Sequence, residues 1–148
     1  MIKQNYNLLL ADDDEDDCDF FKDALDELSL PVSLVVVNDG VQLMDFLAKK
    51  SADLPDILFL DLNMPRKNGS ECLTEIKESK EYSELPVIIF STSLDTQIVD
   101  SMYDKGATYY IRKPGDFTKL KKVIENAINV AAGNNFKQPR REQFILQP

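Results

Sequence analysis

The chain has 148 residues, of which 43% are hydrophobic and 29% charged, a composition typical of one globular domain with a single core. Its 26 acidic and 17 basic residues give a net charge of −9, which argues against non-specific nucleic-acid binding through phosphate neutralisation. No apolar run approaches the ~20 residues of a membrane helix, and the first residues show no signal-peptide pattern, so we expect a cytoplasmic protein without a membrane partner.

Short apolar runs alternate along the chain with longer stretches in which apolar residues have helical spacing. Strands are expected at residues 7–11, 33–37, 57–60, 87–90 and 109–112. Helices are expected at residues 16–28, 40–50, after Gly69, at 96–105 and at 117–132. Five strands that alternate with five helices through short loops predict right-handed crossovers and a parallel sheet. We therefore expect one α/β domain over residues 1–132, doubly wound and flavodoxin-like, with strand order 2-1-3-4-5.

Residues 133–148 differ from the rest of the chain, because they are rich in Asn, Gln and Pro and carry three basic residues against one acid. This tail is too short to be a domain, so it is either a flexible end or a docking segment. Its only apolar element is Phe144-Ile145-Leu146. We favour a flexible end, because chain termini are usually loose unless they are tied down.

The two cysteines and the lack of histidine limit the metal chemistry of the chain. Cys18 and Cys72 both fall within helical patterns, so we expect reduced, half-buried thiols of a cytoplasmic protein rather than a disulfide. A zinc site has almost no support without histidine or a closely spaced cysteine pair.

Polar side chains follow four of the five predicted strands at the point where each strand ends or closes. Asp12 and Asp13 follow the first strand and Asp61 the third, while Ser91 follows the fourth and Lys113 the fifth. The carboxyl ends of parallel strands meet at one edge of the sheet, so we expect these side chains to converge there. The acids at residues 14–17 continue the first run, and we expect them on a solvated first turn of helix, where they suit the helix dipole.

Oxygen ligands without histidine or cysteine favour a hard ion, magnesium or manganese. Asp12 and Asp13 are suited to hold this metal as a pair. Asp61 stands singly at its strand end and is the best candidate nucleophile for phosphoryl transfer, since a carboxylate oxygen can attack phosphorus. The metal and the ammonium group of Lys113 would then neutralise the transferred group.

In this order and on these elements, the motifs resemble the receiver domain of response regulators, the phosphoacceptor of two-component signalling. The likeness runs from about residue 7 to residue 132. The motifs are the acid pair Asp12-Asp13, the segment Leu60-Asp61-Leu62-Asn63-Met64-Pro65 with Gly69 after it, Ser91, and Lys113-Pro114.

The resemblance implies that Asp61 is the residue that becomes phosphorylated. It also implies that Asp13 and Asp61 bind magnesium directly, together with the backbone carbonyl of Asn63. Asp12 would act mostly through water. Manganese is the alternative ion.

The resemblance further implies that Ser91 is a switch hydroxyl and that Lys113 pairs with the phosphoryl group. Tyr110 matches an aromatic ring that moves inward with Ser91, and Ser93, like Asn63, matches a position that tunes the lifetime of the acyl phosphate. The resemblance places a cis peptide bond before Pro114. Gly115 is a departure, because a large apolar residue is commoner there, which leaves the shape of this loop open.

We expect a stand-alone response regulator rather than a classical enzyme. A sensor histidine kinase or a phosphotransfer protein would phosphorylate it, and it would signal by protein contact: by relaying the phosphoryl group, by binding a target, or by pairing with itself through the fourth helix, fifth strand and fifth helix. One alternative is a magnesium-dependent phosphatase of the aspartyl-phosphate type, although Asn63 stands where such enzymes place a second aspartate. The other is a scaffold of receiver fold that works without phosphate.

Overall fold

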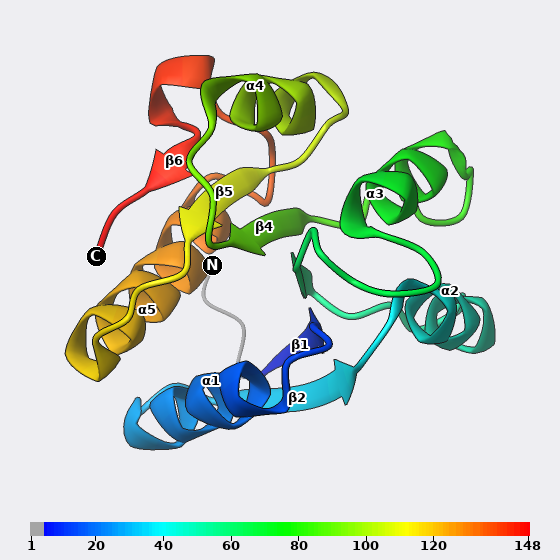
Figure 1. Ribbon diagram of the computed structural model, residues 1–148. Coiled ribbons are helices and arrows are strands. Elements are labelled where there is room, and N and C mark those ends of the chain that lie inside the picture. The colour runs from blue at the N-terminus through cyan, green and yellow to red at the C-terminus, as the bar shows by residue number, and fades with distance from the viewer. Residues whose placement is uncertain (1–4) are drawn as a thin grey trace.

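The computed structural model describes residues 5–148, so the first four residues of the predicted domain lie outside the described part. Its strands form one sheet in the order β2-β1-β3-β4-β5-β6 (Figure 1). The strands are β1 (Tyr6–Ala11), β2 (Val32–Val37), β3 (Ile57–Leu60), β4 (Val87–Ser91), β5 (Tyr109–Arg112) and β6 (Ile145–Leu146). The helices are α1 (Glu15–Glu27), α2 (Gly40–Lys49), α3 (Gly69–Glu78), α4 (Thr96–Asp104) and α5 (Phe117–Gly133), with a short 3-10 helix η1 (Arg141–Gln143).

The predicted doubly wound sheet is confirmed, with one addition. All neighbouring strands pair in parallel, and the first five follow the expected order. The sixth strand, which was not predicted, comes from the tail and pairs in parallel with β5.

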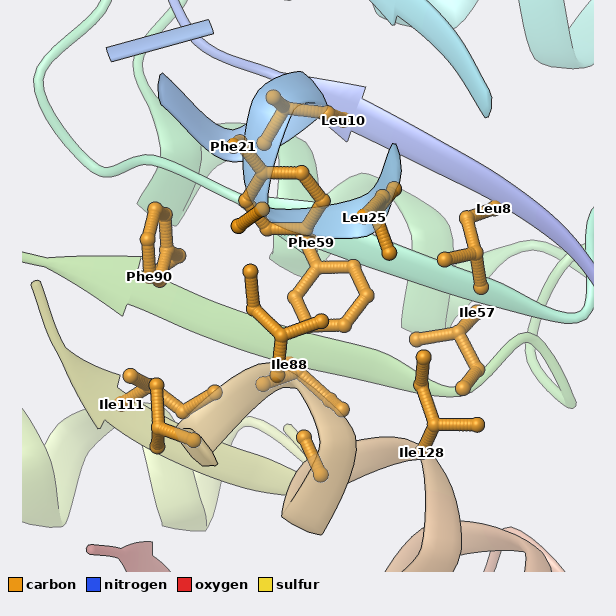
Figure 2. Close-up of a cluster of buried hydrophobic side chains, with 14 of the residues drawn as sticks. Leu8, Leu10, Phe21, Leu25, Ile57, Phe59, Ile88, Phe90, Ile111 and Ile128 are labelled. Carbon is orange, nitrogen blue, oxygen red and sulfur yellow. The ribbon is translucent and has the colours of Figure 1, made fainter. Parts of the chain in front are cut away.

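Helices cover both faces of the sheet, as the near-continuous apolar character of β3 and β4 requires. α1 and α5 pack on one face, and α2, α3 and α4 pack on the other. On the first face, Phe21 of α1 lies between two strand residues, with ring centroids 5.0 Å from Phe59 and 5.5 Å from Phe90 (Figure 2). This aromatic cluster holds α1, whose first turn carries part of the acid run, against the sheet.

Each of the five long helices begins at a side-chain cap. The capping residues Asp14, Asp39, Asn68, Asp95 and Asp116 accept backbone N–H groups that have no partner within their own helix. Because every cap follows a strand of a parallel sheet, the helix N-termini and the strand ends are held at the same edge. No described helix has the length and apolar character to cross a membrane. Both cysteines are buried and free.

The tail packs against the domain, so the flexible end that we favoured is not what the structure shows. Phe144 is fully buried, and its ring centroid lies 5.0 Å from that of Tyr103 in α4 and 6.1 Å from that of Tyr110 in β5. The backbone N–H of Tyr110 donates to the carbonyl of Phe144 at 3.0 Å. The surface that the tail contacts in the structure belongs to its own chain.

Polar contacts also tie the tail to α4. The hydroxyl of Tyr103 donates to the carbonyl of Pro139 at 2.7 Å, and Arg141 Nε lies 2.8 Å from Asp100 Oδ1. α4 and β5 are therefore joined to each other through the tail as well as through the core.

Phe144→Ala tests whether the tail is part of the folded domain. Removing a buried phenylalanine ring costs about 3–5 kcal/mol, and we expect a loss of about 2–4 kcal/mol in the free energy of unfolding because a loosened tail limits the cost. Urea denaturation measures this loss. Gln143→Ala, which changes the exposed neighbouring side chain, is the control and should change stability by less than about 0.5 kcal/mol. Equal stability of the two variants would show that the tail does not contribute to the fold.

Candidate functional site

Three carboxylates meet where β1 and β3 end side by side. Ala11 and Leu60 are partners in the β1–β3 register, so Asp12 and Asp61 are neighbours at the edge of the sheet. One oxygen of each of Asp12, Asp13 and Asp61 lies within 4.8 Å of the other two. Asp12 and Asp61 are buried, whereas Asp13 is exposed. The structure therefore brings together the three acids that the sequence singled out.

Lys113 reaches this cluster from β5 by crossing the end of β4. Its Nζ lies 2.8 Å from Asp12 Oδ2 and 3.7 Å from Asp61 Oδ1. Its backbone N–H donates to the carbonyl of Ser91 at 2.7 Å, and its ammonium group lies 5.5 Å from the ring centroid of Phe90. The backbone hydrogen bond fixes the position of the Lys113 main chain beside β4. The Phe90 ring packs against the side chain and attracts its ammonium group electrostatically.

The charges of the cluster alter the protonation of its members. Burial, together with the nearby Asp12 carboxylate, raises the pKa of Asp61 to about 6 although Lys113 opposes the shift. Burial of Lys113 favours its neutral form, but hydrogen bonds to Asp12 and Asp17 and the charge of Asp61 outweigh burial and raise the pKa of Lys113. The single ammonium group therefore does not fully offset the burial and the neighbouring negative charge that act on Asp61.

The donor set fits a hard divalent cation. It consists of carboxylate oxygens, all within 4.8 Å of one another, and two of the three carboxylates are withdrawn from bulk water. Carboxylate oxygens are the ligands that magnesium and manganese prefer. A divalent charge at this position would oppose both the burial and the repulsion that raise the pKa of Asp61.

The remaining predicted residues lie in the loops around the cluster. Ser91 is buried at the end of β4, where its Oγ accepts the N–H of Ser93 at 3.3 Å. Tyr110 is fully buried, and its hydroxyl donates to the carbonyl of Ser93 at 2.6 Å. The backbone N–H of Asn63 lies 3.4 Å from Asp61 Oδ1, and its side chain is exposed. Ser91 and Tyr110 thus meet at the loop after β4.

Gly69 has a packing role that its position in a predicted turn did not indicate. A Cβ atom at Gly69 would lie 2.2 Å from the backbone oxygen of Asp61, which is closer than real Cβ contacts. α3 can begin against the end of β3 only because this residue has no side chain. The backbone of Asp61 and the start of α3 are consequently packed directly against each other.

Asp17 is the residue that sequence reasoning missed. It was expected on a solvated turn, but its Oδ2 lies 2.9 Å from Lys113 Nζ, and its side chain is 40% exposed. Its place in the first turn of the predicted helix, beside the strand ends, was the only available signal. Nothing in the residue type separates it from the acids around it.

Two details of the β5–α5 loop complete the site. Every described peptide bond is trans, including the one before Pro114, so the cis bond implied by the resemblance is not found. A Cβ atom at Gly115 would meet nothing within 4 Å, so open space surrounds this position.

The chain is similar in sequence to proteins of known families. A family model described as response regulator receiver domain matches residues 8–125. The response regulator Rcp1 of Synechocystis sp. is 28% identical over 122 residues, which are 80% of this chain and 83% of Rcp1. The DNA-binding transcriptional regulator NtrC of Proteus hauseri is 36% identical over 103 residues, which are 70% of this chain but only 21% of NtrC.

Solved structures agree with the sequence matches. The phosphorylated cyanobacterial phytochrome response regulator RcpA superposes with a TM-score of 0.79 at 28% identity, covering 88% of this chain and 96% of RcpA. The manganese-bound form of Rcp1 superposes with a TM-score of 0.74 at 27% identity, covering 82% of this chain and 90% of Rcp1.

Asp61→Asn tests the electrostatic strain of the cluster. A carboxylate whose pKa is higher in the folded than in the unfolded state destabilises the fold above its unfolded pKa, since the folded protein must give up a proton that it binds more tightly. At pH 7 without divalent metal, we expect the variant to be more stable by about 1–3 kcal/mol. The gain should shrink as the pH falls from about 6 toward 4, because the folded wild-type carboxyl takes up its proton over this range.

Urea denaturation across this pH range measures the effect, and Asp45→Asn, an exposed acid on α2, is the control. A gain that does not change with pH, or a loss of stability at pH 7, would contradict the electrostatic explanation.

Proposed function

The chain belongs to the response regulator receiver domain family, and from this premise we propose that Asp61 accepts a phosphoryl group from a sensor histidine kinase or a phosphotransfer protein. The observation that carries the proposal is the geometry of Asp61, a buried carboxylate in an acidic cluster with an ammonium group 3.7 Å away. The phosphorylated structure of RcpA supports it, since that relative carries the modification on a similar fold.

We assign the metal site to Asp13 and Asp61, with the backbone carbonyl of Asn63 as a further ligand and Asp12 acting through water. The manganese-bound structure of Rcp1 supports a divalent ion here, and magnesium is the ion that we expect. When bound, this ion would neutralise charge on the phosphoryl oxygens. The ion would also offset part of the negative charge of Asp12, which would weaken the ion pair between Asp12 and Lys113.

In the proposed transfer, an oxygen of Asp61 forms a bond to phosphorus while the bond from phosphorus to the donor's imidazole nitrogen breaks. The imidazole leaves with the electron pair of that bond and takes a proton from solvent. Since burial raises the pKa of Asp61 only to about 6, the nucleophile is largely ionised at neutral pH. Lys113 would move its ammonium group onto a phosphoryl oxygen, where it stabilises the charge of the transition state.

Phosphorylation would change the loops at the ends of β4 and β5. The added charge, roughly −1.5 to −2, would attract the hydroxyl of Ser91 and the ammonium group of Lys113. Movement of Ser91 would alter the loop that holds the hydroxyl of Tyr110 through Ser93. Asn63 and Ser93 would tune the lifetime of the acyl phosphate from positions beside the phosphoryl group.

The output face that we propose is the one made by α4, β5 and α5, and it includes the docked tail. β6 covers the free edge of β5 and η1 is bonded to α4. A second copy of the chain or a target that binds this face would therefore contact tail residues in addition to helix residues. Protein contact is the output that this surface supports.

Phosphorylation by acetyl phosphate with magnesium, followed by intact-protein mass spectrometry, tests the proposal. We expect one labile phosphoryl adduct on the wild type and none on Asp61→Ala, because the nucleophile is removed. Asp45→Ala should be modified like the wild type, since Asp45 is exposed and outside the cluster. An adduct that persists in Asp61→Ala would refute the assignment, and turnover of small phosphate esters would favour a phosphatase instead.

Magnesium binding is tested by thermal or urea unfolding with and without the ion. Binding to the folded state adds about 1–3 kcal/mol when the ion is at roughly ten to one hundred times its dissociation constant. Asp13→Asn should lose most of this gain while keeping its stability without metal, because Asp13 is exposed. Asp16→Asn removes the same charge outside the cluster and should keep the gain. A full response to magnesium in Asp13→Asn would exclude Asp13 as a ligand.

A further inference from the structure

The ammonium group of Lys113 is held by a carboxylate that does not belong to the acid cluster. Asp17 Oδ2 lies 2.9 Å from Lys113 Nζ, as close as Asp12 Oδ2 at 2.8 Å. Asp61 Oδ1, at 3.7 Å, is beyond hydrogen-bond distance. In this structure, Lys113 is therefore hydrogen-bonded to Asp12 and to Asp17 of α1. Its attraction to Asp61, the residue that would be phosphorylated, is electrostatic only.

Asp17 differs from Asp12 in what happens when a cation occupies the cluster. Asp12 is one of the three acids whose oxygens lie within 4.8 Å of one another. A cation bound there would offset part of the negative charge of Asp12 and weaken its attraction for Lys113. Asp17 is outside that group, on the first turn of α1. Its attraction for Lys113 therefore persists under the conditions in which a phosphoryl group reaches Asp61.

The position of Asp17 is fixed by the fold rather than by the ion pair. Its backbone N–H donates to the capping oxygen of Asp14 at 3.0 Å, and Phe21, one turn further along α1, is fully buried among the strands. The Lys113 side chain, which is only 10% exposed, has little other space to occupy. The pair is consequently a built contact between α1 and the end of β5.

We propose that Asp17 is a positioning residue that competes with the phosphoryl group on Asp61 for the ammonium group of Lys113. The inference rests on the proposed function, since it needs a phosphoryl group at Asp61. Pairing with a phosphoryl oxygen would draw the ammonium group toward Asp61 and away from Asp17, so Asp17 lowers both the affinity for a phosphoryl-like ligand and the rate of phosphorylation. The competition is limited in size, because water reaches Asp17 and weakens its ion pair.

The opposite effect is expected if the pair is only structural. In that case Asp17 would hold Lys113 and α1 in the geometry that binding needs, and its removal would weaken binding or change nothing. The test therefore needs a measurement that changes in one direction for competition and in the other for a structural role, and that does not simply follow the stability of the variant. The affinity for beryllofluoride, a mimic of the phosphoryl group, provides one, measured by isothermal titration with magnesium present at a saturating concentration.

Three variants form the test. Asp17→Asn removes the competing charge with little change of shape, and we expect about three- to tenfold tighter beryllofluoride binding and a similar gain in the initial rate with acetyl phosphate. Asp16→Asn is the matched control: it removes the same charge from the same helical turn, where the described residues provide no ion pair or hydrogen bond for that side chain. Asp17→Glu restores a carboxylate within reach of Lys113 and should behave like the wild type.

Equal or weaker beryllofluoride binding by Asp17→Asn would overturn the inference, and so would an equal gain in Asp16→Asn, which would indicate a general effect of net charge. The proposed function fails separately: if the wild type forms no adduct at Asp61 with acetyl phosphate and does not bind beryllofluoride, both proposals fall. If the wild type does both and Asp17→Asn shows no gain, only the role of Asp17 is wrong. Urea unfolding of each variant shows whether a change of stability accompanies the change in binding.

Discussion

The buried ion pair between Lys113 and Asp12 is the interaction on which the rest of the site depends. Two carboxylates end adjacent strands inside the protein, and the only ammonium group that the structure describes between them comes from β5, on the far side of β4. Removing one partner of such a buried pair typically costs about 3–5 kcal/mol, because a charge is left without compensation. The observed strand order places β5 close enough for the Lys113 side chain to cross the end of β4 and reach both acids.

This dependence explains why so much was predictable from the sequence. An apolar run that ends in aspartate can be recognised without any structure, and the chain contains two, ending in Asp12 and Asp61. In a parallel sheet all strand ends of one kind meet at one edge, so finding the strands also places the acids, the hydroxyl of Ser91 and the ammonium group of Lys113. The five helices were predictable for the related reason that one face of each packs on the sheet, which imposes a period of 3.6 residues.

The features that were missed depend on how elements fit together rather than on local pattern. β6 has two residues, too few for any periodicity. It forms where Phe144 packs against Tyr103 and Tyr110, both of which lie more than 30 residues earlier in the chain. Asp17 is one of several acids in a row, and only the rotation of α1 relative to β5 turns it toward Lys113 while Asp16 faces solvent. The close approach of α3 to the backbone of Asp61 at Gly69 is equally invisible in a sequence, because a glycine in a loop has many possible causes.

β5 connects the acidic cluster with the tail, and this has a thermodynamic consequence. The strand is followed by Lys113 at the cluster, and within it Tyr110 bonds to the loop after β4 through its hydroxyl and packs against Phe144 through its ring. Moving the ring away would break the hydroxyl bond and the contact with the tail together. A ligand that favours one position of Tyr110 must therefore change the docking equilibrium of the tail, and by reciprocity the docked tail changes the affinity for that ligand by the same factor. Because the tail is also bonded to α4 through Arg141, any such change reaches the outer surface of the domain at α4.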